Sequence, residues 1–194
     1  MSLTESTMLE LGTPIPDFDL FDVISGKSIK PADFKSQTGL LVIFLCRHCP
    51  YVIHITNELP KLGKDYLPRG IGIVAISSND PESHPEDGPE NLRQMGKELG
   101  LNYPLCFDLT QEAAKAFKAA CTPEFYLFDE NRRLVYRGQL DDSRPGNDKP
   151  VDGHSLRQAM DAVLSGKPVD TCQKPGIGCN IKWRKGNEPG YFGR

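Results

Sequence analysis

Residues 40–52 read LLVIFLCRHCPYV, and this stretch predicts the fold of the chain. The apolar run at residues 40–45 is typical of a central strand that is covered on both faces of a sheet. From Cys46 onward the pattern becomes helical, with apolar side chains on one stripe: Val52, Ile55, Leu59 and Leu62. Pro50 suits the first turn of this helix, while Pro60 is expected to kink or end it. We therefore predict a buried strand that leads directly into a helix.

Two cysteines, Cys46 and Cys49, stand at this junction with two residues between them. At a helix N-terminus, unsatisfied backbone N–H groups and the helix dipole stabilise a thiolate and lower the pKa of its thiol. Arg47 and His48 add positive charge between the two sulfurs. We predict a redox pair in which Cys46 is the attacking thiolate and Cys49 is the more buried, resolving thiol.

A metal-binding module is the alternative that a CxxC pair leaves open. Strong zinc patterns contain a second such pair or a matched pair of histidines. The remaining cysteines, at positions 106, 121, 172 and 179, form no second CxxC motif. His48 and His54 lie near the pair, but a single histidine on a helix face is usually solvated. The redox interpretation is therefore preferred, and we expect no metal among the site residues.

The rest of the chain continues the alternation of strands and helices. The predicted strands are residues 18–21, 28–29, 71–76, 125–128 and 134–136, the first two and the last two forming hairpins. The predicted helices are residues 91–99, 111–119 and 155–164, the last one capped by Ser155. Residues 77–89 are polar and predict a surface loop, and Cys106 is expected in the core. This order predicts an α/β domain whose central mixed β-sheet is flanked by helices.

The C-terminal segment has a different composition from the rest. Residues 166–194 are rich in Gly, Pro and Lys and contain Cys172, Cys179 and the only Trp. We predict one domain over residues 1–165 and an extension over residues 166–194 that packs on it or trails from it. A permanent disulfide between Cys172 and Cys179 is disfavoured in a reducing compartment, and a second relay pair is left as an alternative.

Composition and charge exclude several classes of protein. A net charge of −3 gives no basic surface for nucleic acid. No window approaches 18 consecutive apolar residues, and the N-terminus lacks the pattern of a secretory signal, so we expect a cytoplasmic protein with no membrane partner. Six cysteines are too few for a disulfide scaffold. No cofactor-binding motif is present, so no cofactor is expected.

A second motif, CTPEF at residues 121–125, places Thr122 and Pro123 directly before a predicted strand. With this Thr-Pro and the CxxC pair, the chain resembles the thioredoxin-like superfamily. PDFDL at residues 16–20 is similar to the peroxiredoxin-like branch, of the alkyl hydroperoxide reductase/thiol-specific antioxidant (AhpC/TSA) type. Four segments further resemble single-domain, CxxC-bearing members of that branch: CRHCPYV, CTPEFYLFD, LVYRGQLDDSRP and GIGCNIKW. The resemblance covers nearly the whole chain.

This resemblance implies a thioredoxin-like layered sandwich with an N-terminal hairpin and a C-terminal extension. It implies that Cys46 and Cys49 are the redox pair and that Pro123 is a cis-proline packed against them, with Thr122 before it. Arg47 and His48 would support the site, and Cys121 is either an accessory thiol or a small buried residue. The predicted strand at residues 40–45 lacks the buried acid with which thioredoxins move protons; Asp80 is a weak substitute.

The peroxidase activity of the branch is the second alternative function. Peroxiredoxins place a Thr three residues before the reactive Cys and an Arg near a later strand. When Cys49 is matched to that Cys, the Thr position is occupied by Cys46, and no arginine lies between Lys118 and Phe128. Both activating groups are therefore missing from the sequence.

We accordingly predict a thiol–disulfide oxidoreductase. Its substrates are expected to be protein or small-molecule disulfides or thiols, and its electrons to come from a recycling thiol such as thioredoxin or glutathione. Positive charge near the sulfurs favours the reduced thiolate, so we expect a potential less reducing than the roughly −270 mV of thioredoxin.

Overall fold

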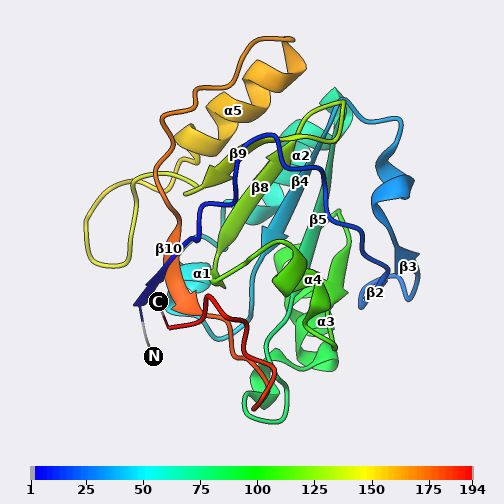
Figure 1. The fold of residues 1–194 in the computed structure, drawn as a ribbon, viewed down its shortest axis with the longest axis vertical. Helices are drawn as coiled ribbons and strands as arrows, with labels where there is room; N and C mark the ends of the chain where they lie inside the picture. Colours follow the sequence, from blue (N-terminus) through cyan, green and yellow to red (C-terminus); the bar gives the residue numbers. More distant parts are fainter. Residues whose placement is uncertain (1–2, 194) are drawn as a thin grey trace.

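The computed structural model describes residues 3–193 and shows a mixed sheet between two layers of helices and loops (Figure 1). The seven strands of this sheet are ordered β3-β2-β6-β5-β4-β8-β9. Their bounds are β2 Leu20–Asp22, β3 Ser28–Ile29, β4 Gly39–Phe44, β5 Ile71–Ser77, β6 Leu105–Phe107, β8 Glu124–Phe128 and β9 Leu134–Gly138. β4 runs parallel to β5 and antiparallel to β8, so the central sheet is mixed, as predicted.

A second, smaller sheet joins both ends of the chain to the segment before β8. Its strands are β1 (Leu3–Glu5), β10 (Ile177–Asn180) and β7 (Cys121–Thr122), in the order β1-β10-β7 and antiparallel throughout. The C-terminal extension supplies β10 and is thereby packed against the domain. The division of the chain at residue 165 stays a prediction.

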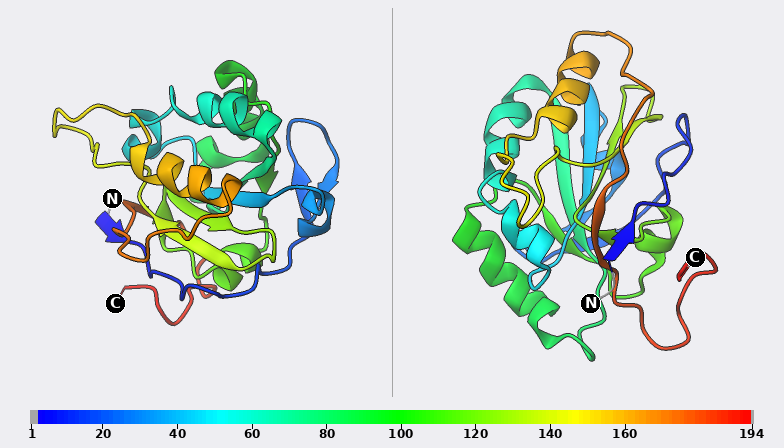
Figure 2. Two further views of the ribbon diagram at one scale, coloured as in Figure 1. Left: turned by 90° about the horizontal axis from the view of Figure 1, so that it is seen from above. Right: turned by 90° about the vertical axis from the view of Figure 1, so that its left-hand side faces the viewer.

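The helices lie on both faces of the large sheet (Figure 2). Their bounds are α1 Pro50–His54, α2 Leu59–Tyr66, α3 Pro89–Leu99, α4 Glu112–Ala116 and α5 His154–Leu164; three short 3₁₀ turns are Pro31–Phe34, Leu67–Arg69 and Pro85–Asp87. One face is covered by α1, α2, α3 and α5. The other is covered by α4, the N-terminal segment and the end of the C-terminal extension. No helix among residues 3–193 is long and apolar enough to cross a membrane.

Strand β4 contributes to the core on both faces, because every one of its residues is buried. Leu41 and Ile43 join the cluster under α1, α2, α3 and α5. Leu40, Val42 and Phe44 join the cluster under α4, where Phe117 packs edge-on against Phe44 at a ring separation of 5.5 Å. This two-sided burial is what the continuous apolar run predicts, and it fixes the end of β4 from which the site begins.

The helix predicted after Cys46 is divided in two. α1 ends at His54, and α2 begins at Leu59 with Pro60 as its second residue. The helix is interrupted shortly before Pro60, as the prediction requires, but Pro60 itself lies in the first turn of the second helix and does not end one. A proline lacks the N–H that would bond to the carbonyl four residues earlier, so a continuous helix stops before it, while the first turn of a new helix accepts it.

Two further local predictions are corrected. The polar stretch at residues 77–89 is not a simple surface loop, because Ser78, Asn79 and Asp87 are buried in it. α5 is capped by Gly153 in a left-handed conformation rather than by Ser155, whose hydroxyl is instead bonded to Gln139.

Candidate redox site

The CxxC pair stands where the chain leaves β4 and turns into α1. The backbone N–H of Leu45 still bonds to Ile76 of β5, and Cys46 follows it directly. Cys49 is the N-cap residue of α1 and Pro50 its first helical residue. Both cysteine residues are completely buried, with 0% exposure. The strand–helix junction predicted from the sequence is confirmed.

The Thr122–Pro123 segment faces this pair from β7 and the start of β8. Its peptide bond is cis, as the resemblance implies. Cys46 Sγ lies 3.3 Å from the hydroxyl oxygen of Thr122, and Cys49 Sγ lies 3.2 Å from the carbonyl oxygen of the same residue. The structure therefore brings together four residues that the sequence singled out at two distant positions.

A third thiol, Cys179, belongs to the same site, although the sequence suggested for it only a second relay pair with Cys172. Cys179 of β10 lies directly opposite Thr122 in the antiparallel register. It is buried, and its side chain is in hydrogen-bond contact with that of Cys49. Cys172, the partner that the sequence offered, is exposed, whereas the buried Cys179 contacts the CxxC pair.

Protons are distributed unequally between the two cysteines of the pair. The thiol of Cys46 donates a hydrogen bond to Cys49; together with contacts from Cys179 and the Val52 N–H, this lowers the pKa of Cys49 to about 5 despite its burial. The pKa of Cys46 is raised by this same bond to Cys49, by burial and by the negative charge of Asp87. The interaction between the two side chains thus lowers the pKa of Cys49 and raises that of Cys46. The expected lowering of the Cys46 pKa is not found.

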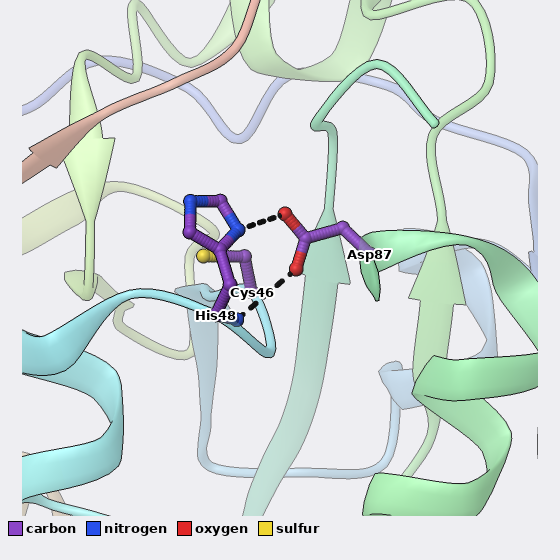
Figure 3. A group of neighbouring side chains, drawn as sticks. All are labelled: Cys46, His48 and Asp87. Carbon is purple, nitrogen blue, oxygen red and sulfur yellow. Dashed lines mark hydrogen bonds and ion pairs between the residues drawn. The ribbon is translucent and has the colours of Figure 1, made fainter. Parts of the chain in front are cut away.

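Asp87 is the charged group that binds the CxxC turn (Figure 3). Its Oδ1 accepts the backbone N–H groups of Arg47 and His48 at 2.7 and 3.2 Å. Its Oδ2 lies 2.5 Å from His48 Nδ1 and 2.7 Å from the side-chain nitrogen of Asn79. Asp87 is itself completely buried. It fixes the turn between the two cysteines and orients the imidazole of His48.

The positive charges expected between the sulfurs are arranged differently in the structure. The guanidinium of Arg47 donates to the carbonyl of Asn91 at 2.7 Å and lies 3.7 Å from Glu98, so it binds α3. The imidazole of His48 is paired with the carboxylate of Asp87. The low pKa of Cys49 therefore comes from hydrogen-bond donors rather than from Arg47 and His48.

Cys46, His48 and Asp87 are also the residues that could hold a metal ion. One donor atom from each lies within 4.8 Å of the other two among the described residues. A thiolate, an imidazole and a carboxylate are ligands that Zn²⁺ accepts. Each oxygen of Asp87, however, already accepts two hydrogen bonds, and the imidazole is one of the donors. An ion would have to replace part of this network.

The other candidate thiols lie in different surroundings. Cys121 is buried with its sulfur 4.0 Å from the carbonyl oxygens of Pro123 and Gly176, and burial raises its pKa. Cys106 is in the core, as predicted, and burial raises its pKa as well. Cys172 is exposed. His54 bonds to the hydroxyl of Ser143 at 2.7 Å.

Two buried carboxylates beside the site were not predicted from the sequence. One is Asp87, which lies in the stretch predicted to be a surface loop. The other is Glu124, which follows Pro123 and accepts the backbone N–H groups of Ala120 and Cys121; complete burial raises its pKa. An acid between a Thr-Pro and an apolar strand was the available signal for Glu124. Asp80, named as a weak substitute, bonds to backbone N–H groups of its own loop.

The sequence matches the Redoxin family over residues 10–153, more than half of the chain. The chain belongs to the Redoxin family. Among curated relatives it is similar to the thiol–disulfide oxidoreductase ResA of Geobacillus thermodenitrificans, with 25% identity over 134 residues, which cover 68% of this chain and 70% of the relative.

Two solved structures illustrate the likeness of the fold. The crystal structure of an uncharacterised conserved protein from Geobacillus kaustophilus has a TM-score of 0.93 and 52% identity, covering 95% of this chain and 97% of the other. That of a putative thiol:disulfide interchange protein DsbE from Chlorobium tepidum has a TM-score of 0.64 at 18% identity, covering 80% and 99%. The second likeness concerns the fold alone. The predicted thioredoxin-like, peroxiredoxin-like class is confirmed.

Proposed function

We propose that this chain is a thiol–disulfide oxidoreductase that cycles Cys46 and Cys49 between a dithiol and a disulfide. The observation that carries the proposal is the position of both sulfurs against Thr122, at 3.3 Å from its hydroxyl and 3.2 Å from its carbonyl oxygen, beside the cis Thr122–Pro123 peptide. A thiolate at neutral pH is the reactive form in disulfide exchange. The relatives named thiol–disulfide oxidoreductase support the same activity.

Cys46 is proposed as the attacking sulfur and Cys49 as the resolving one. Cys46 first loses its proton. His48 is the nearby acceptor, because a ring nitrogen of it lies within 4.8 Å of the sulfur and its Nε2 has no hydrogen-bond partner among the described residues, while Nδ1 is bonded to Asp87. The Cys46 thiolate attacks a substrate disulfide and forms a mixed disulfide, while the leaving substrate thiolate takes up a proton. The Cys49 thiolate then attacks Cys46 Sγ, which forms the Cys46–Cys49 disulfide and releases the second substrate thiolate.

The substrate class and the partners follow from this chemistry as further proposals. A protein or small-molecule disulfide accepts the electrons, and a thiol such as thioredoxin or glutathione returns them to the pair. A cytoplasmic location stays a prediction of the sequence, and an antioxidant role is proposed only from the resemblance to the peroxiredoxin-like branch.

A redox titration tests the proposal. The protein is equilibrated in dithiothreitol buffers, its free thiols are alkylated, and the state of each cysteine is determined by mass spectrometry. We expect one two-electron transition between roughly −270 and −120 mV, assigned to Cys46 and Cys49. Cys172→Ser is the matched control, because Cys172 is exposed, and it should leave the transition unchanged. The absence of a Cys46–Cys49 disulfide at every potential would refute the proposal.

Metal binding is the second candidate, favoured by the grouping of Cys46, His48 and Asp87. Titration of the reduced protein with Zn²⁺, followed by calorimetry, separates it from the redox function. If the group is a metal site, His48→Ala and Asp87→Ala abolish tight binding. If it is only the hydrogen-bond network described above, the wild type binds Zn²⁺ no more tightly than these variants do.

A further inference from the structure

The C-terminal extension covers the strand edge beside the CxxC pair with a segment that contains a thiol. β10 pairs with β7 so that Cys179 lies opposite Thr122 and Asn180 opposite Cys121. In Figure 1, β10 lies beside α1, the helix that begins at Cys49. The edge formed by β7 is thus occupied by the chain itself.

The approach of β10 to this edge depends on a glycine. A Cβ atom at Gly178 would lie 2.0 Å from the carbonyl oxygen of Thr122 and 3.2 Å from the nitrogen of Pro123. Any other residue would force β10 away from the Thr-Pro segment. In β10, therefore, Gly178 allows the close contact with Thr122, and the next residue, Cys179, supplies the thiol.

Three sulfurs converge on Thr122 as a result. Cys46 contacts its hydroxyl at 3.3 Å, Cys49 its carbonyl at 3.2 Å, and Cys179 is its partner across the strands. Cys49 is the central sulfur, because its side chain contacts both Cys46 and Cys179. The sulfur of Cys121 faces backbone carbonyls 4.0 Å away, and Cys172 is exposed.

We propose that Cys179 is a third redox thiol, which attacks Cys49 of the Cys46–Cys49 disulfide and moves the disulfide to Cys49–Cys179. In this step the thiolate of Cys179 forms the new S–S bond, the Cys46–Cys49 bond breaks, and Cys46 leaves as a thiolate that takes up a proton. The number of disulfides is unchanged, so the exchange needs no further oxidant. This inference rests on the proposed function, which supplies the Cys46–Cys49 disulfide.

The surroundings of Cys179 change in favour of this step when the pair is oxidised. In the reduced protein its pKa is raised to about 12 by burial and by the hydrogen bond and negative charge of Cys49. Oxidation of Cys49 removes the last two causes, and the positive charge of Lys182 continues to favour the Cys179 thiolate. The exchange returns Cys46 in the reduced state while the chain keeps its oxidising equivalent.

The test maps disulfides in variants made in a Cys172→Ser background. Trypsin cleaves after Arg47 and therefore places Cys46 and Cys49 on different peptides. Cys172 and Cys179 share one peptide, so the background substitution makes the assignment of Cys179 unambiguous. Each variant is treated with oxidised glutathione, alkylated, digested and analysed for cross-linked peptides.

Cys46→Ser leaves Cys49 with Cys179 as its contacting thiol, and we expect a Cys49–Cys179 cross-link as its main product. Adding Cys179→Ser should reduce any cross-link to Cys49 at least about tenfold, because thiols outside disulfide geometry cannot bridge. Adding Cys121→Ser instead should leave the cross-link in place.

The outcomes separate the inference from the function on which it rests. If Cys179→Ser forms Cys46–Cys49 but Cys46→Ser never forms Cys49–Cys179, the inference is overturned and the proposed function stands. If no disulfide to Cys49 forms in any variant, both fail. A Cys49–Cys179 cross-link in Cys46→Ser, with part of the wild type in the same state, supports the third thiol.

Discussion

The low pKa of Cys49 rests first on the hydrogen bond from the Cys46 thiol, and two substitutions at position 46 test this. Cys46→Ala removes the donor, whereas Cys46→Ser keeps an O–H group in its place. A donor bonded to the charged form favours that form, so its loss raises the pKa of Cys49. We expect the pKa of Cys49 to rise in Cys46→Ala and to stay low in Cys46→Ser.

The size of the effect follows from the nature of the lost bond. A hydrogen bond to a charged group contributes roughly 1.5–3 kcal/mol, which corresponds to about 1–2 pKa units. The pKa of Cys49 would then move from about 5 to about 6–7, still below the ordinary 9.0, because the other donors, from Cys179 and the Val52 N–H, remain. At pH 6 the thiolate fraction of Cys49 should fall about two- to tenfold.

Two measurements follow the titration. The ultraviolet absorbance of the thiolate is recorded against pH, and alkylation of Cys49 by iodoacetamide is followed on its tryptic peptide at the same pH values. The Cys46→Ser variant controls for the loss of the sulfur itself. The reasoning is refuted if Cys46→Ala keeps a Cys49 pKa near 5, or if the alanine and serine variants titrate alike.

Four further predictions concern the surroundings of the site and the core. Asp87→Asn should lower the pKa of Cys46, because the negative charge of Asp87 raises that pKa. The change is followed by the thiolate absorbance, and the control Asp80→Asn should leave the pKa of Cys46 unchanged. Glu124→Gln should flatten the pH dependence of unfolding in urea. The pKa of Glu124 is raised in the folded state, so Glu124 contributes fully to stability below its unfolded-state pKa, and this contribution is lost as the pH rises through its folded-state pKa. The prediction is contradicted if the wild type gains no stability relative to Glu124→Gln as the pH is lowered. Phe117→Ala should lower the free energy of unfolding by about 3–5 kcal/mol, because it removes a completely buried ring that packs against Phe44 and other aromatic rings. A loss under about 1 kcal/mol would argue against this packing. Finally, peroxide consumption in the presence of a dithiol should not exceed that of the dithiol alone, and faster consumption that requires Cys49 would restore the peroxidase alternative.

The structure leaves the expected redox potential less reducing than that of thioredoxin, but it assigns this expectation a different physical cause. The sequence attributed a stabilised thiolate to Arg47 and His48. In the structure Arg47 binds α3 and His48 is paired with Asp87, while hydrogen-bond donors stabilise the thiolate of Cys49. A potential less reducing than about −270 mV is still expected, because a stabilised thiolate favours the reduced state.

Most of the secondary structure could be predicted because its signals are local. The run at residues 40–45 and the run at residues 71–76 are buried strands, and the hairpin of β8 and β9 follows the predicted turn. The errors occurred where local signals were ambiguous. Pro60 is compatible with either the end or the first turn of a helix, and only the packing of α2 against the sheet decides between them.

The candidate site could be predicted in part for the same reason. Cys46 and Cys49 are adjacent along the chain, and Thr122–Pro123 is a local pattern before a strand. Asp87 gave no such signal, because its role depends on a turn that brings it to residues 40 positions earlier. A polar loop and a buried anchor for the CxxC turn have the same composition when they are seen in sequence alone.

The sequence by itself determined most strands of the large sheet, most of its covering helices and the position of the CxxC pair, because hydrophobic periodicity and the strand–helix junction are properties of neighbouring residues. Only the tertiary structure decided which groups surround the two sulfurs. The register of β10 on β7 places Cys179 opposite Thr122, whose hydroxyl and carbonyl groups contact Cys46 and Cys49, and the charge of buried Asp87 raises the pKa of Cys46. The physical reason is that hydrogen bonding and electrostatic interaction depend on distance in space, which residues far apart in the chain share only after folding.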